Sequence, residues 1–422
     1  MTIASGSPSA RPIHRGLDAL FRLLEERHRP VALSLMLLVL TAGIGYVIWL
    51  GDVIRFPDER EYLTLAQHLA SRHLFSYDGV TPTTLHSPGW PLFLAPWVGL
   101  GLNVTGLHLL TMVLFVATLG ATWRFMVRAA GPSTGALALL LLLAYPVLFF
   151  AGSTLYAQTF GALLFLLGLL LIAGPEPRSA WSYLVAGLLY GWLVLAIPMF
   201  LPSIVVVAAW RLPPLSRPKI ARVTVLLAAV GLVVGLWIAR NYAHTGRFIF
   251  VAGYAEQVLL AGNSPLASAS GGGNTDMRAF DSVASRMSEP ERRQYYRHEA
   301  WRWLTGHPRQ AIRLYFSKVL YWFSPTNRLA QADQQTAGRD LIMILTYCPL
   351  LLLFVVRLLQ FRRYPLQSWE ALFYLLYLQA ALCYAVFFPR IRYRLPYDYL
   401  LISVVAGYIC AGWKFHRQRA AA

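Results

Sequence analysis

The chain has 422 residues, of which 57% are hydrophobic and only 13% are charged, and its mean hydropathy is +0.51. Its formal net charge of +18 would suit a nucleic-acid-binding protein, but the basic residues fall between apolar segments rather than in one solvated patch, so membrane topology explains them better. The three cysteines lie inside apolar segments, which excludes a disulfide framework. Composition therefore predicts an all-α polytopic membrane protein without a nucleic-acid partner.

Ten apolar segments approach the length of about 20 residues that a membrane-spanning helix needs. They are 31–50, 107–127, 134–151, 155–173, 180–196, 199–211, 221–239, 340–359, 367–387 and 397–414. With ten spans and both termini cytoplasmic, Lys and Arg concentrate in the inner loops and tails, as topology requires. The shorter stretch 90–102 is rich in Pro and Gly. An eleventh span there would invert every later loop, so we expect an interfacial or re-entrant segment.

This topology divides the chain into five parts and predicts a plasma (inner) membrane protein whose active site faces the periplasm or the cell exterior. The parts are a cytoplasmic tail (1–30), a transmembrane bundle (31–239) with a first external loop (51–106), a large external loop (240–338), the C-terminal transmembrane helices (339–414) and a second cytoplasmic tail (415–422).

Three acidic residues, Asp58, Glu59 and Glu61, follow the first apolar segment. Asp58 with Glu61 three residues later fits a capping box that starts a helix of about 59–73. A cap needs only one acid, however, and Asp58 and Glu59 stand side by side just outside a span, with His86 in a second polar turn. The residues alone leave capping and catalysis equally open for Asp58.

Three arginines, Arg390, Arg392 and Arg394, occupy the turn between the last two spans, on the predicted outer side. Charge at that depth costs a few kcal/mol unless it is paired. A phosphate is a suitable partner, because a guanidinium group binds it through two hydrogen bonds. Contact with lipid headgroups is the alternative.

The large loop contains further candidates. Arg240 and Asn241 follow a span and suit a binding role, although an interfacial arginine and a helix-ending asparagine explain them as well. The Gly-rich stretch 268–274 predicts a flexible loop. The amphipathic pattern over 308–323 indicates a helix anchored along the membrane surface. Lys318 within it is a further candidate for a lipid phosphate.

Several of these motifs resemble the GT-C glycosyltransferases, in particular the protein O-mannosyltransferases and the bacterial lipid A aminoarabinose transferases. The acidic pair with Tyr62 and Ala66 downstream, followed by the turn 86–92, is similar to their first external loop. A Trp-x-x-Arg-Asn-Tyr signature matches 237–242, a Gly-Asn-x-Pro turn matches 262–265, and an Arg-Tyr-x-x-Pro turn matches 392–396.

The resemblance implies a GT-C-like bundle of about 10 transmembrane helices with interfacial helices in two external loops. It implies sugar transfer, with inversion, from a polyprenyl-phosphate donor to a glycan, lipid or protein acceptor, without a cofactor or a metal. Asp58 would be the general base, and Glu59 would orient the acceptor or the helix start. The donor phosphate would be held by Arg390, Arg392, Arg394, Arg240 and Lys318. The substrate would contact Tyr62, His86, Asn241 and Asn263.

Two departures from the family pattern leave the donor open. The turn 152–158 lacks the acid that relatives often carry, and Ala196-Ile197-Pro198 stands where many have Thr-Arg-Pro. Two alternatives also remain. One is a polysaccharide polymerase or ligase with a diphosphate-linked donor. The other is a lipid-linked sugar flippase or transporter, although the span centres are nearly free of ionisable residues and no internal repeat is visible.

Overall fold

The computed structural model describes residues 12–174, 179–327 and 336–421, so parts of the predicted N-terminal tail (1–11) and large loop (328–335) lie outside the described residues. The described residues contain helices and no strands, which confirms the all-α prediction. The helices are α1 (Pro12–Glu26), α2 (His28–Leu50), α3 (Pro57–Arg72), α4 (Gly89–Gly99), α5 (Val104–Ala130), α6 (Pro132–Leu143), α7 (Pro146–Gly152), α8 (Ala157–Ile172), α9 (Ala180–Ala196), η1 (Pro198–Phe200), α10 (Leu201–Trp210), α11 (Arg217–Thr245), α12 (Ala255–Gly262), η2 (Gly272–Asn274), α13 (Arg278–Ala284), α14 (Glu289–Gly306), α15 (Pro308–Tyr321), α16 (Ala337–Leu359), α17 (Ser368–Val386) and α18 (Ile391–Ala421).

All ten predicted apolar segments fold into helix, and the protein is a multi-pass membrane protein. Among the described residues, six helices are long and apolar enough to cross a membrane: α2, α5, α11, α16, α17 and the first 25 residues of α18. The pair α6 and α7, bent by 75° between them, makes a seventh if it counts as one span. The helices α8, α9 and η1 with α10 are shorter, so the count of ten spans stays a prediction.

The apolar stretch 90–102 forms α4, an 11-residue helix. At 1.5 Å per residue it is far shorter than the hydrocarbon core of a bilayer, which is about 30 Å thick. It is held in place at its first turn, where the Trp90 indole donates a hydrogen bond to the Leu155 carbonyl (2.6 Å). Gly89 is needed there because a Cβ would clash with the backbone of Ala196. The helix therefore lies in the protein as a short packed element that supports α3.

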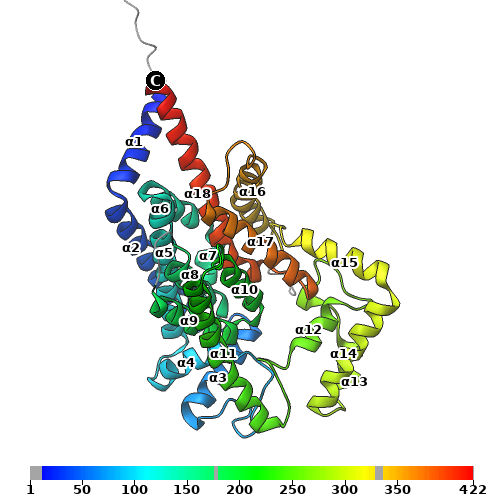
Figure 1. Cartoon of the computed structure of the whole chain (residues 1–422). Helices are drawn as coiled ribbons and strands as arrows, with labels where there is room; N and C mark the ends of the chain where they lie inside the picture. Colours follow the sequence, from blue (N-terminus) through cyan, green and yellow to red (C-terminus); the bar gives the residue numbers. More distant parts are fainter. Residues whose placement is uncertain (1–11, 175–178, 328–335, 422) are drawn as a thin grey trace, which may run out of the picture.

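The two ends of the bundle carry different parts of the chain (Figure 1). Helix α1 and the C-terminal part of α18 lie side by side at one end, where Phe21 stacks on Trp413 (4.6 Å between ring centroids). Helices α3 and α4 lie at the other end, and α12 to α15 form a lobe beside the bundle. The loop between α3 and α4 touches this lobe, because the Gly253 amide donates to the Thr84 carbonyl (2.7 Å). The two loops that topology predicts on one side of the membrane are thus in contact.

The lobe has a small core of its own, formed by Leu260, Ala284, Tyr296 and Ala300. The Gly-rich stretch 268–274, predicted as a flexible loop, is instead a defined turn that contains η2. Gly272 adopts a left-handed φ of +51°, and a Cβ there would lie 2.8 Å from Arg390 Nε. Glycine is therefore required for the turn to pack closely on an arginine, which the sequence pattern could not reveal.

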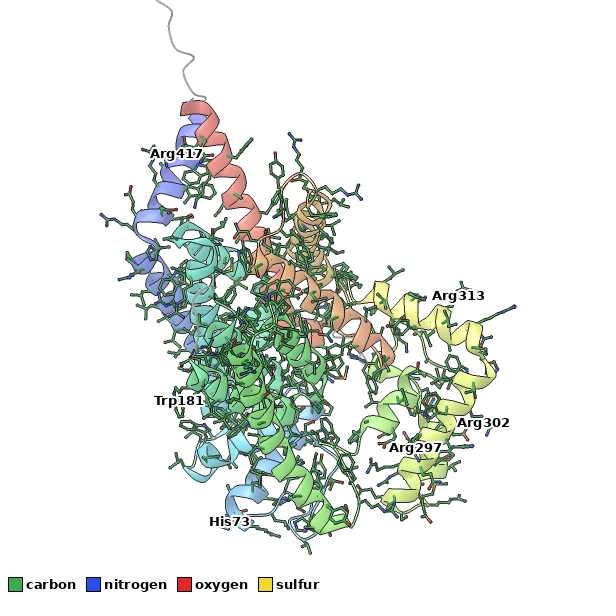
Figure 2. All side chains as sticks on the ribbon, viewed as in Figure 1. His73, Trp181, Arg297, Arg302, Arg313 and Arg417 are labelled. Carbon is green, nitrogen blue, oxygen red and sulfur yellow. The ribbon has the colours of Figure 1, made fainter. Side chains whose placement is uncertain are left out.

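The outer surface of the lobe carries both basic and apolar side chains. Figure 2 shows Arg297 and Arg302 on α14 and Arg313 on α15 pointing away from the protein, and all three are exposed. Helix α15 is amphipathic, as predicted. Its exposed apolar side chains are Ile312, Phe316 and Leu320, whose relative exposures lie between 59% and 73%. A helix of this kind suits the membrane surface.

Candidate active site

Asp58 does not cap helix α3, so this alternative for its role was wrong. The helix begins two residues earlier than expected, at Pro57, with Phe56 as the N-cap residue. Proline is favoured at this first position because it lacks the N–H that would go unsatisfied there. The carboxylate that reaches back to the Phe56 amide is that of Glu59 (3.1 Å). Asp58 is therefore not used in starting the helix, and 34% of its side chain is exposed.

Glu59 is completely buried and bonds only to backbone amides of described residues. Its Oε2 accepts hydrogen bonds from the amides of Arg55 (2.8 Å) and Phe56 (3.1 Å). Its Oε1 accepts one from the amide of Leu155 (2.9 Å), in the turn between α7 and α8. These contacts favour the second of the two roles predicted for Glu59, orienting the helix start. They fix Asp58, its neighbour, relative to the turn that precedes α8.

Asp58 forms an ion pair with Arg392, which lies in the first turn of α18. Its Oδ2 is 2.7 Å from Arg392 Nη1, and 30% of the arginine side chain is exposed. The guanidinium group lies over the rings of Tyr156 (4.7 Å) and Tyr393 (5.1 Å), and its Nη2 donates to the Tyr393 hydroxyl (3.2 Å). Its Nε is buried and has no hydrogen-bond partner among the described residues. An acid of the first loop and an arginine of the last helix thus share one site.

His86 belongs to a second polar cluster, which includes Glu61, one helical turn from Asp58 on α3. Its Nε2 lies 3.1 Å from an oxygen of Glu61, and its Nδ1 is hydrogen-bonded to the Tyr77 hydroxyl. Tyr62 and Tyr254 contact its ring edge to face, with centroids 5.6 and 5.3 Å away. Burial lowers the pKa of His86 to about 4, so the ring is neutral at physiological pH. The predicted site residues Tyr62 and His86 are therefore brought together near Asp58.

Arg390 lies just before α18 and is engaged by the lobe. Its Nη2 donates to Asn274 Oδ1 (2.8 Å) and to the Gly271 carbonyl (3.4 Å). Burial, and next the charge of Arg392, lower the pKa of Arg390. This residue holds the Gly-rich turn next to the start of α18.

Arg394 has no part in an exposed site, which corrects its prediction as a phosphate ligand. Only 1% of its side chain is exposed. Its Nη1 donates to the carbonyls of Trp322 (2.8 Å) and Ser324 (2.7 Å), its Nε pairs with Asp398 (3.2 Å), and its Nη2 donates to the Tyr145 hydroxyl (3.2 Å). Every nitrogen of the guanidinium group is occupied by protein. Arg394 therefore holds the chain after α15 against the bundle.

Arg240 and Asn241 are likewise occupied by the protein, so they do not fit the predicted roles in phosphate and substrate binding. Arg240 Nη1 donates to the Thr83 carbonyl (2.8 Å), and its guanidinium group lies over the Trp237 ring (4.7 Å). Asn241 is fully buried, and its Nδ2 donates to the Ile249 carbonyl (3.3 Å). The Trp-x-x-Arg-Asn signature thus binds backbone carbonyls of two loops and joins α11 to both.

Lys318 and Asn263, predicted to contact phosphate and substrate, bind each other. Lys318 is fully buried, and its Nζ donates to Asn263 Oδ1 (3.0 Å). Asn263 Nδ2 donates in turn to the carbonyls of Leu259 (2.9 Å) and Val386 (2.8 Å). Burial lowers the pKa of Lys318 to about 8. The pair links α12, α15 and the end of α17, which is a structural role.

Reasoning from the sequence missed four side chains of the site: Tyr77, Tyr156, Glu61 and Tyr254. The spacing of Glu61, three residues after Asp58, was a signal for a shared helix face, but it was interpreted as part of a cap. The tyrosines gave no local signal, because they come from three separate loops. Across the described ranges, no group of three His, Cys, Asp or Glu side chains lies close enough to hold a metal ion.

No protein-family model matches the chain, and no curated protein matches it. Among solved structures, it is similar to ArnT from Cupriavidus metallidurans bound to undecaprenyl phosphate, with a TM-score of 0.42 and 15% identity over 93% of this chain and 78% of that one. It is similar to the apo state of the same protein with a TM-score of 0.39 and 14% identity over the same shares.

Proposed function

We propose that the chain is an integral-membrane glycosyltransferase that moves a sugar from a polyprenyl-phosphate donor to an acceptor hydroxyl at the external face. The observation that carries the proposal is the pair of Asp58 and Arg392 at 2.7 Å. In it, a partly exposed carboxylate lies beside a guanidinium group whose buried Nε has no hydrogen-bond partner in the described part of the chain. A base for the acceptor and a cation for the leaving phosphate are the two groups that this transfer needs.

Arg392 is the proposed ligand of the donor phosphate. A buried N–H without an acceptor destabilises a protein by about 1–3 kcal/mol, and a phosphate oxygen at Nε would remove that penalty. Stacking on Tyr156 and Tyr393 holds the guanidinium plane, so its Nε and Nη2 edge can bind two phosphate oxygens at once. The position also suits a lipid, because α18 is a candidate membrane span and the donor chain would run along apolar helices.

Asp58 is the proposed general base. As the acceptor oxygen attacks the anomeric carbon, its proton passes to the Asp58 carboxylate. The bond between that carbon and the phosphate oxygen breaks, and both bonding electrons leave with the polyprenyl phosphate. Arg392 stabilises the negative charge that develops on this leaving group. A single in-line displacement inverts the configuration at the anomeric carbon.

Replacing Asp58 with Asn tests this mechanism. The amide keeps the size of the side chain, and α3 is started by Glu59, so the fold should survive while proton abstraction is lost. Sugar transfer, measured with a panel of polyprenyl-phosphate sugars, should slow by at least about 10²-fold. Asp276→Asn is the matched control, because that carboxylate is exposed and, within the described ranges, its ion-pair partner is Arg278 alone. Transfer by Asp58→Asn at the parent rate would exclude Asp58 as the base.

A further inference from the structure

His86 connects the Tyr77 hydroxyl to Glu61, through a hydrogen bond at Nδ1 and a close contact at Nε2. Because the ring is neutral, only one of its nitrogens carries a proton. Nε2 faces a carboxylate oxygen at 3.1 Å, so Nε2 is the donor and Nδ1 accepts from the Tyr77 hydroxyl. We assign this tautomer from the hydrogen-bond network. Glu61 is therefore placed with one carboxylate oxygen beside the Nε2 edge of His86.

Glu61 has further capacity to accept hydrogen bonds. Among the residues that the structure describes, His86 is its one polar partner, and 41% of its side chain is exposed. Burial, and next the charge of Asp58, raise the pKa of Glu61, which shows that the two carboxylates lie near each other. On a helix, residues three apart share a face, with about 5–6 Å between their Cβ atoms. Glu61 therefore faces the same space as the proposed base.

Aromatic rings contact His86 next to Glu61. Tyr62 contacts one side of the His86 ring, and Tyr254, 38% of which is exposed, contacts it from the lobe. Two hydrogen bonds fix the lobe here. The Gly253 amide donates to the Thr84 carbonyl (2.7 Å), and the Thr84 hydroxyl donates to Glu289 Oε1 (3.0 Å). The partly exposed carboxylate of Glu61 thus lies beside His86, whose ring contacts Tyr62 of α3 and Tyr254 of the lobe.

We infer that Glu61, His86 and Tyr254 form the acceptor subsite, and that it takes a neutral, polyhydroxylated acceptor, namely a sugar. The inference rests on the proposed function, because it uses Asp58 as the base one turn away. Sugar hydroxyls donate to a carboxylate, and the C–H faces of a sugar ring pack on tyrosine. An acceptor bearing a phosphate or a carboxylate would be repelled by Asp58 and Glu61 together.

This assignment divides the site into two halves around Asp58. Arg392 lies on the donor side, where its positive charge suits a phosphate. Glu61 lies on the acceptor side, where a second negative charge favours hydroxyl groups over anions. Because the negative charges of Asp58 and Glu61 repel anions, the acceptor half also disfavours binding of the donor phosphate. A change at Glu61 should therefore alter acceptor binding and leave donor binding unchanged.

Ligand-detected NMR on the full chain tests the inference without requiring turnover. The protein is placed in nanodiscs, which avoids sugar-based detergents, with a saturating polyprenyl phosphate occupying the donor side. The probes are methyl β-glucoside, methyl β-galactoside and methyl phosphate. Saturation transfer to at least one glycoside is expected, and none to methyl phosphate. Glu61→Ala and Tyr254→Leu should each weaken glycoside binding by about tenfold or more, the effect of losing a charged hydrogen bond or a ring contact.

Controls separate this inference from the proposed function. Glu299→Ala removes a comparable carboxylate that pairs with Arg302 at the surface of the lobe, and it should bind glycosides like the parent. Polyprenyl-phosphate affinity and thermal unfolding are measured in the same samples, so a misfolded variant is recognised. Parent-like glycoside binding by both Glu61→Ala and Tyr254→Leu would overturn the subsite, as would a preference for methyl phosphate. Failure of the proposed function would instead appear as no binding of polyprenyl phosphate.

Discussion

Replacing Arg392 separates a phosphate ligand from a structural arginine. In Arg392→Ala, the contact with the donor phosphate is lost; the loss of even one charged hydrogen bond, worth about 1.5–3 kcal/mol, should raise the dissociation constant by about 10- to 150-fold. The fold should tolerate the change. The ion pair with Asp58 is 30% and 34% exposed, and such pairs stabilise a protein by only about 0–1 kcal/mol. Arg392→Lys keeps the charge without the planar fork, so it should recover part of the affinity.

The measurement is a titration of the purified protein with a polyprenyl phosphate, followed by intrinsic tryptophan fluorescence. Arg302→Ala is the control for the loss of one positive charge, because Arg302 is exposed on α14 and pairs only with Glu299 among the described residues. Thermal unfolding of each variant shows whether the fold is retained. If Arg392→Ala is folded and binds the lipid within twofold of the parent, the unpartnered Nε is not a phosphate ligand and the donor site lies elsewhere.

Three further predictions concern residues whose roles the structure changed. Arg394→Gln leaves the buried Asp398 without its cation and should reduce stability by about 3–5 kcal/mol, seen as a lower melting temperature or loss of folded protein. In Glu59→Gln, an NH2 group replaces one carboxylate oxygen, so either the amides of Arg55 and Phe56 or the amide of Leu155 lose their acceptor, and stability should fall by about 1–3 kcal/mol. If Glu59 does not touch substrate, the folded fraction keeps its transfer rate. His86 has a pKa of about 4 when folded and 6.5 ordinarily, so between these values only the unfolded state takes up its proton. The free energy of unfolding should therefore decrease by up to about 3 kcal/mol as the pH is lowered from about 6.5 to about 4. His86→Gln should reduce this decrease, as measured by chemical unfolding at a series of pH values.

The sequence alone determined the class of the protein and the positions of its apolar helices. Apolar segments near spanning length can be recognised from local composition alone. All ten of them are helical in the structure. The resemblance to the GT-C glycosyltransferases pointed to Asp58, Tyr62 and His86 as candidates, and to the three outer arginines without distinguishing among them. The amphipathic character of α15 follows from its residue spacing.

Only the tertiary structure decided which arginine belongs to the site. Arg390, Arg392 and Arg394 look equivalent as every second residue of an outer turn, but α18 begins at Ile391. On a helix, Arg392 and Arg394 are separated by about 200° and so point in opposite directions. One therefore meets Asp58, while the other is buried against Asp398, four residues later on its own face.

The role of Asp58 was undecided for a similar reason. Asp58 and Glu59 are both acids at the start of one helix, and local sequence allows either to cap it. The amide of Leu155, from a distant turn, binds Glu59 and holds it inside the protein. That single long-range contact gives the structural role to Glu59 and leaves Asp58 facing Arg392. Contacts between residues far apart in the chain carry this information, and no local pattern contains them.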